Sequence, residues 1–368
     1  MKLFECQNCG QVLYFENTLC ENCKFILGYL SDQANLSALT PNGPDTWRPL
    51  ATPEETFRFC DNARHKACNW LIPAESTHGL CRACRLNRTI PNLEIPENLL
   101  LWQQLEAAKH RLAYALLRFG LPMVDRKEDP EAGLAFDFLS GSDSPFRETA
   151  PVVTGHSHGL ITIDLAEADP AAREQHRQDM AEPYRTLLGH FRHETGHYYW
   201  DRLIRDGEWL EACRGVFGDE RCDYGAALKD HYANAPRADW PVYFISHYAS
   251  AHPWEDFAET WAHYLHIVDT LETASAFGLA VHPKAGDDPF LHMEIDFDPY
   301  VEGDFDLLVQ AWVPLTSAVN NLNTSMGQPD LYPFVLSPAV IGKLRFIHGL
   351  IHSPRGKDVR AYRSLSLG

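Results

Sequence analysis

The stretch HFRHETGHYYWDRL, residues 190–203, carries the pattern HETGH. On a helix, His193 and His197 lie four residues apart and project from one face, so two imidazole nitrogens can bind one zinc ion. Glu194 lies beside them without being a ligand, where it can take a proton from a water molecule that the metal activates. The alternative is a solvated helix face, but the aromatic and aliphatic flanks predict a buried helix. A buried pair of imidazoles with a carboxylate needs partners, and a metal provides them.

A catalytic zinc ion needs a third protein ligand and an open fourth position. The residue six after His197, where some HExxH proteins have a third histidine, is Leu203. The stretch WEDFAETWAHY, residues 254–264, offers carboxylates instead. Pro253 suits the first turn of a second helix, and Glu255 falls in that turn. We therefore expect Glu255 to complete the site.

The second helix has one face lined by small residues, and it carries a further carboxylate. Ala258 and Ala262 would let it approach the HExxH helix closely. Glu259, one turn after Glu255, allows three interpretations. It could accept the outer N–H of a ligand histidine and fix its tautomer, it could be a solvated helix carboxylate, or it could be a rival third ligand.

Eight of the ten cysteines precede residue 85, and in a reducing compartment such a cluster indicates metal sites, not disulfides. Two CxxC pairs predict a closed zinc ribbon with four thiolates: Cys6, Cys9, Cys20 and Cys23. A second set predicts another structural site: Cys60, Cys68, Cys81 and Cys84. Only one pair of this set has the CxxC spacing, so His65 and His78 compete as ligands. Metal binding would supply the folding energy of such small modules.

The distribution of cysteines and of apolar residues predicts three domains: residues 1–45 as a zinc ribbon with a linker, 46–95 as a second zinc module, and 96–368 as the catalytic domain. The segment 31–50, rich in Ser, Asn and Pro, is interpreted as the linker. Apolar spacing of three and four residues predicts helices near 98–120, 183–205, 253–271, 304–322 and 337–351, and a strand is expected within 152–165. The predicted fold class is α+β.

Charge and hydropathy exclude several function classes. Of the formal net charge of −18, −17 falls on residues 96–368, which disfavours polyanion binding by the molecule as a whole. The N-terminal part has one basic cluster, Arg82, Arg85 and Arg88, and a nucleic-acid role for the zinc modules rests on these three residues alone. No run of about 18 apolar residues exists, and the N-terminus lacks the continuous apolar stretch of a secretory signal. We expect a cytoplasmic protein with no membrane association.

HETGH followed by WEDFAETWAHY resembles the gluzincin metallopeptidases, whose third zinc ligand is a glutamate of a second helix. With the cysteine-rich start, RLNRTIPNL and LYPFVLSPAVIGKLRF, the whole chain resembles bacterial zinc-binding metallopeptidases that carry an N-terminal zinc-ribbon region. The resemblance implies a zincin-like domain with a small sheet above the HExxH helix. It also implies the ligands His193, His197 and Glu255, with Glu194 as the base.

Some gluzincins place a tyrosine seven residues before the ligand glutamate, aimed at the oxyanion that forms on the substrate. Here that residue is Tyr248, with His247 and Tyr264 as competitors. A phenol donor there would stabilise charge that develops only in the transition state.

The expected function is therefore zinc-dependent hydrolysis of a peptide or protein substrate, with one catalytic and two structural zinc ions. The alternative is an inactive adaptor in which metal only braces the fold, and the zinc modules could recruit a protein partner in either case. Because zincins commonly bind peptide along a sheet edge, the segment 159–165 is our candidate edge strand. We also expect Trp70, Leu71 and Ile72 to pack the second module on the catalytic domain, and Cys213 and Cys222 to be reduced packing cysteines.

Overall fold

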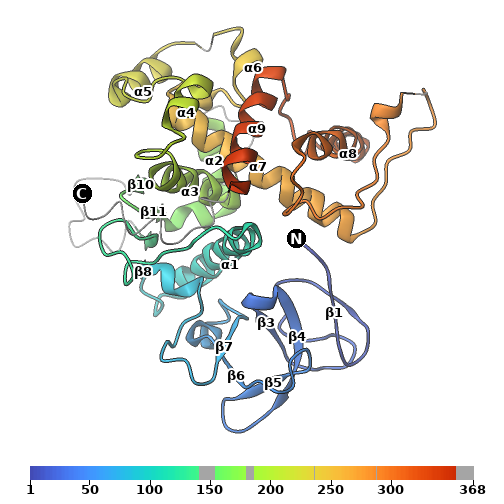
Figure 1. Cartoon of the computed structure of the whole chain (residues 1–368). Coiled ribbons are helices and arrows are strands. Elements are labelled where there is room, and N and C mark those ends of the chain that lie inside the picture. The colour runs from blue at the N-terminus through green and yellow to red at the C-terminus, as the bar shows by residue number, and fades with distance from the viewer. Residues whose placement is uncertain (141–153, 180–185, 236, 287, 354–368) are drawn as a thin grey trace. The chain divides into compact units, whose positions relative to one another are not determined.

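The computed structural model describes residues 1–140, 154–179, 186–235, 237–286 and 288–353 (Figure 1). The chain divides into two compact units. The first comprises Met1–Arg118 and Met123–Arg173, and the second comprises Phe119–Pro122 and the chain from Glu174 onward. Helices and sheets occur together, so the α+β class is confirmed.

The first unit begins with a short hairpin and a five-stranded antiparallel sheet. The hairpin pairs β1 (Phe4–Glu5) with β2 (Val12–Leu13). The sheet has the strand order of the sequence: β3 (Leu27–Leu30), β4 (Asn35–Pro41), β5 (Trp47–Pro49), β6 (Phe57–Phe59) and β7 (Leu71–Pro73). Leu30, Leu39, Phe57 and Leu71 form its core cluster.

The interpretation of residues 31–50 as a linker is wrong, because β4 and β5 lie in the middle of this sheet. The polar residues that suggested a linker have partners. Ser37 is fully buried, and its hydroxyl accepts a hydrogen bond from the backbone N–H of Ala51 at 3.1 Å. Gln7, which lies between Cys6 and Cys9, accepts a hydrogen bond from the Ala38 N–H through its Oε1 at 2.8 Å. A polar sequence therefore forms a mostly buried strand here, because neighbouring loops satisfy its hydrogen-bonding groups.

A four-stranded sheet and a long helix complete the first unit. The strand order is β10-β11-β9-β8, made of β10 (Gly155–Ser157), β11 (Leu160–Asp164), β9 (Ala135–Leu139) and β8 (Asn87–Thr89). The predicted helix is α1 (Pro96–Phe119), which ends before Gly120 at a positive φ of 70°. The prediction of an edge strand at 159–165 is wrong, because β11 pairs with β10 on one side and with β9 on the other.

The second unit is helical in its described part. The predicted long helices are confirmed as α3 (Leu187–Leu203), α7 (Pro253–Ala276), α8 (Phe305–Ser325) and α9 (Pro338–His352). Four shorter helices did not follow from the sequence: α2 (Pro170–Asp179), α4 (Leu210–Phe217), α5 (Tyr224–Ala233) and α6 (Trp240–Tyr243). Among the described helices, none is long and apolar enough to span a bilayer.

Helices α3 and α7 pack closely, as the small residues predicted. A Cβ atom added at Gly196 would lie 2.8 Å from the Ala258 Cα, so only glycine fits that position of α3. Beside this contact the rings of Tyr199 and Trp261 stack at 4.9 Å, and both side chains are fully buried. The contact holds the two helix faces that carry the predicted ligands at a short, fixed separation.

Candidate metal centres

Local capping sets where α3 and α7 begin. The Thr186 hydroxyl accepts the Gly189 N–H at 3.0 Å at the start of α3. At the start of α7, His252 Nδ1 accepts the Trp254 N–H at 3.1 Å, and Pro253 occupies the first turn as predicted. Glu255 therefore stands in the first turn of α7.

The structure brings His193, His197 and Glu255 together in a buried group. The two Nε2 atoms lie 3.2 Å apart, and Glu255 Oε2 lies 3.0 Å from His193 Nε2 and 3.4 Å from His197 Nε2. Ligand atoms around a tetrahedral zinc ion are separated by about 3.3 Å. Glu255 Oε2 is buried and accepts no hydrogen bond. An orphaned carboxylate oxygen at this spacing fits a metal ion bound by the three residues.

The charges of the group also favour a cation. Burial lowers the pKa of His193, yet the adjacent carboxylates of Glu255 and Glu259 outweigh burial and raise that pKa well above its usual value. Burial raises the pKa of Glu255, but His197 and then His193 hold it well below its usual range. The buried carboxylate of Glu255 and the partly buried carboxylate of Glu259 thus favour positive charge between the helices, which a proton or a metal ion can supply.

Glu259 is not a member of the group of His193, His197 and Glu255, but it contacts His193. Its Oε1 is 2.7 Å from His193 Nδ1, and its Oε2 accepts a hydrogen bond from the Ser246 hydroxyl at 2.6 Å. With Nδ1 donating to Glu259, the Nε2 lone pair of His193 is free to bind a metal. This geometry matches the first of the three interpretations of Glu259, and Ser246 is a partner that the sequence analysis missed.

Two tyrosines lie beside the group. The Tyr248 ring is 5.8 Å from the His193 ring, and burial, followed by the charge of Glu255, raises the pKa of Tyr248. Tyr224, which the sequence analysis missed, donates a hydrogen bond to Glu255 Oε1 at 2.7 Å. The two alternatives to Tyr248 have other partners. The Tyr264 hydroxyl is hydrogen-bonded to His348 Nδ1 at 2.9 Å, and the His247 ring stacks on the His231 ring at 4.2 Å.

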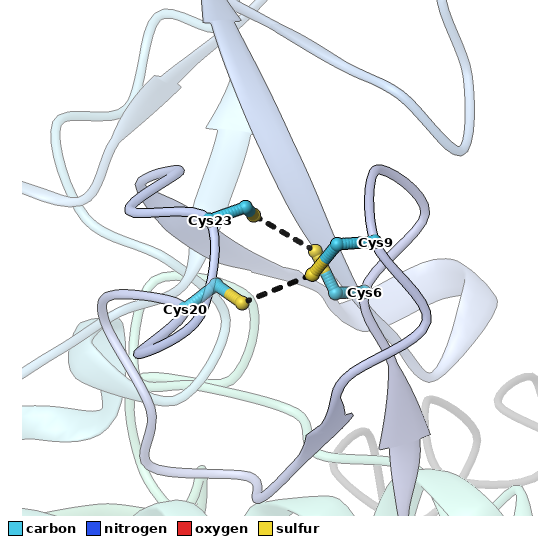
Figure 2. A group of neighbouring side chains, drawn as sticks. All are labelled: Cys6, Cys9, Cys20 and Cys23. Atoms are coloured by element: carbon cyan, nitrogen blue, oxygen red, sulfur yellow. Dashed lines mark hydrogen bonds between the residues drawn. The ribbon is translucent and has the colours of Figure 1, made fainter.

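The first cysteine set forms a cluster between two loops (Figure 2). The Cys6 and Cys23 sulfurs lie 3.6 Å apart, and those of Cys9 and Cys20 lie 3.7 Å apart. Thiolates around one zinc ion are separated by about 3.8 Å. Burial raises the pKa of Cys6 to about 12, whereas a backbone hydrogen bond from Phe25 lowers that of Cys23 to about 6. A cation is needed to hold all four as thiolates, so this set fits a structural zinc ion.

The second set, Cys60, Cys68, Cys81 and Cys84, also forms one group. His65 is not part of this group, and its ring packs against Trp102 at 5.9 Å. His78 instead offers its backbone carbonyl to Arg58 at 2.6 Å. Four thiols alone therefore satisfy the spacing of a zinc site, as predicted.

Helix α1 lines the second cysteine set with three buried polar side chains that the sequence analysis missed. His110 Nε2 lies 3.6 Å from Cys84 Sγ, while its Nδ1 donates to the Glu106 carbonyl at 2.6 Å. The Lys109 ammonium is 2.7 Å from the Glu106 carboxylate, and both side chains are fully buried. The spacing of i, i+3 and i+4 on a helix was the available signal.

Two further expectations have mixed outcomes. Trp70 does contact α1, since its ring lies 5.2 Å from that of His110, but Leu71 belongs to the sheet cluster of β3–β7. Cys213 is buried, and burial raises its pKa to about 12, as suits a packing cysteine. Cys222 is exposed, so that part of the expectation is wrong.

The basic cluster of the N-terminal part is compensated by carboxylates. Arg82 pairs with Asp32 at 3.0 Å, and Arg85 lies 3.8 Å from Asp125. Arg88 binds the buried carboxylate of Asp137 through two nitrogens. These pairs reduce the charge available for phosphate contacts.

Comparison with known proteins matches two parts of the chain to known families. Residues 98–350 match the model of a family described as "Putative zinc-binding metallo-peptidase". The chain belongs to this family. Residues 3–95, which hold both cysteine sets, match a zinc-ribbon domain. Proteins of Mycobacterium tuberculosis and Mycobacterium bovis, both described as uncharacterized, are 42% identical over 352 residues and 95% of each chain. No solved structure matches.

Family membership supports a zinc peptidase in general terms, and the family name and the cysteine sets support zinc as the metal. The roles of individual residues remain predictions that the geometry fits.

Proposed function

We propose that the protein is a zinc-dependent peptide hydrolase of the gluzincin type, with a zincin-like catalytic domain. The observation that carries the proposal is the orphaned Glu255 Oε2, 3.0 and 3.4 Å from the Nε2 atoms of His193 and His197. When bound there, zinc would act as a Lewis acid that polarises the scissile carbonyl and acidifies water.

In this mechanism Glu194 takes a proton from the attacking water and later gives it to the leaving amine. It stands next to His193 on α3 and is only 9% exposed, so bulk water does not screen its charge. Tyr248 donates its phenol proton in a hydrogen bond to the substrate oxyanion, which stabilises charge that develops in the transition state. Glu259 holds the His193 ring in the orientation that binding requires.

The test is cleavage of a peptide library by the wild type and by Glu194→Gln. The substitution keeps the ligands and removes the base, so cleavage should fall by about 100-fold or more. Glu211→Gln is the matched control, because Glu211 is an exposed carboxylate on α4 that pairs only with Arg214 in the described contacts. Cleavage that survives in Glu194→Gln would rule out the mechanism. Absence of cleavage with the wild type would favour the adaptor role, with metal bracing the fold.

A further inference from the structure

The two oxygens of Glu255 have different surroundings. Oε2 faces the histidine nitrogens, whereas Oε1 accepts the hydrogen bond from the Tyr224 hydroxyl at 2.7 Å. Since Oε1 is held by a neutral donor, only Oε2 remains directed at the position between the imidazoles. The carboxylate is thereby set to offer one oxygen instead of two.

Several contacts fix Tyr224 in this position. Asp223 caps α5 by accepting the Ala226 N–H at 2.9 Å, which makes Tyr224 the first residue of the helix. The Tyr224 ring meets the His252 ring edge-on at 5.2 Å and the Trp254 ring at 5.9 Å. Tyr224 thus rests against the residues that begin α7, in the same turn as Glu255.

His252 ties the preceding turn to the same helix end. Its Nδ1 accepts the Trp254 N–H at 3.1 Å, so Nε2 must carry the proton, and it lies 3.2 Å from the Cys222 carbonyl that accepts it. A single neutral tautomer satisfies both contacts. The segment that leads into Tyr224 is therefore anchored on the first turn of α7.

We propose that Tyr224 is a positioning residue that fixes Glu255 as a one-oxygen zinc ligand and so preserves the open fourth position. The inference rests on the proposed metal site and assigns Tyr224 a role distinct from that of Tyr248. A carboxylate that swung to chelate with both oxygens would occupy the coordination position that a substrate needs. Tyr224 acts through Glu255 and the metal, whereas Tyr248 acts on the substrate.

The experiment measures zinc content of the full chain after dialysis against a series of buffered free-zinc concentrations. Glu255→Ala defines the zinc held by the rest of the chain. Removal of an outer partner of a ligand typically weakens metal binding by about 10- to 100-fold. Tyr224→Phe should therefore raise, by that factor, the free-zinc concentration at which the site is half occupied. Tyr248→Phe should leave this concentration unchanged. Tyr232→Phe is the matched control, since Tyr232 lies on the same helix and is 61% exposed.

The zinc measurement needs no peptidase activity, so it decides this inference even if the chain cleaves no peptide. A Tyr224→Phe midpoint equal to that of the wild type would overturn it. An equal shift in Tyr232→Phe would also overturn it, because the effect would then come from general loosening of α5. Where cleavage is measurable, saturating zinc should restore activity to Tyr224→Phe but not to Tyr248→Phe.

Discussion

Gly196 shows how one residue sets the geometry of the proposed metal site. It occupies the variable part of the HExxH pattern, and the pattern itself does not require glycine. The requirement comes from α7, because an added Cβ would lie 2.8 Å from Ala258 Cα and 3.2 Å from the Ala258 carbonyl oxygen. Backbone atoms cannot move aside as a flexible side chain can.

We therefore expect Gly196→Ala to destabilise the fold by about 1–3 kcal/mol, as overpacking of a core does. It should also weaken zinc binding, because α3 would be pushed away from Glu255. Gly215→Ala is the control: Gly215 is exposed on α4 with no atom within 4 Å of an added Cβ, so alanine should stabilise by up to about 1 kcal/mol. Denaturant unfolding of both variants measures the difference. Equal stability of the two would contradict the packing argument.

We expect His263 to make stability depend on pH. It is 5% exposed, and burial lowers its pKa to about 4, while its Nδ1 lies 2.8 Å from the Tyr332 hydroxyl. The unfolded chain binds a proton near pH 6.5 and the folded chain only near pH 4. Stability is therefore fully present above about pH 6.5 and falls as the pH drops toward 4, by up to about 3 kcal/mol for this residue.

Unfolding measured at pH 7.5 and pH 4.5 should show the loss, and His263→Gln should reduce it. The same loss in the variant and the wild type would show that other groups cause the acid sensitivity.

The site residues differ in how well the sequence predicted them. His193, His197 and Glu255 followed from helical spacing and from the first turn of a helix that begins with proline. Tyr224 could not be predicted, because it reaches Glu255 from a different helix and only tertiary packing relates the two. His110 and Glu106 are on one helix face, but nothing in the sequence says that this face meets Cys84.

At the scale of elements, α7 and α9 are joined by a buried ion pair. Lys343 Nζ lies 2.6 Å from Asp256 Oδ2 and 2.6 Å from the Tyr243 carbonyl oxygen, and Asp256 is fully buried. Burial nevertheless raises the pKa of Asp256 to about 7, against the opposing effect of Lys343.

We expect Lys343→Met to lower the free energy of unfolding by about 3 kcal/mol, because it leaves the buried carboxylate of Asp256 without its partner. The cost should be larger at pH 8 than at pH 6, where Asp256 can take up a proton. Arg345→Met is the control on the same helix, since the Arg345 pair with Asp306 is about half exposed and should cost less than about 1 kcal/mol. Equal, small costs for both would contradict a role for the buried pair in holding α7 to α9.

Element prediction succeeded where helices are long and periodic, as for α1, α3 and α7. It failed at β4 and β5, because Ser, Asn and Pro are typical of linkers and their hydrogen-bond partners lie elsewhere in the chain. The edge strand was wrong for a related reason: alternation identifies a strand but does not say which strands flank it.

At the scale of the whole molecule, the three proposed ligand groups predict a zinc content near three ions per chain. Elemental analysis of protein never exposed to chelators measures it. A value near two would remove one of the three assignments, and Glu255→Ala and Cys68→Ser, measured separately, would show which. A content of one ion in folded protein would contradict both cysteine sites.

The last prediction concerns removal of residues 1–91. Trp102, Lys109 and Tyr114 of α1 are fully buried, and their partners lie in that segment: Trp102 meets His65, Lys109 contacts Asn87, and Tyr114 meets Phe15 at 5.4 Å. A chain that starts at residue 92 would expose two aromatic rings and an ammonium whose packing is lost. It should therefore bind a hydrophobic dye, melt at a lower temperature and lose stability in denaturant. Full-length protein stripped of zinc should move in the same direction, because the cysteine clusters hold the segment together. If the shortened chain is monomeric and as stable as the full chain, the zinc-ribbon region is a tethered module, and α1 does not depend on it.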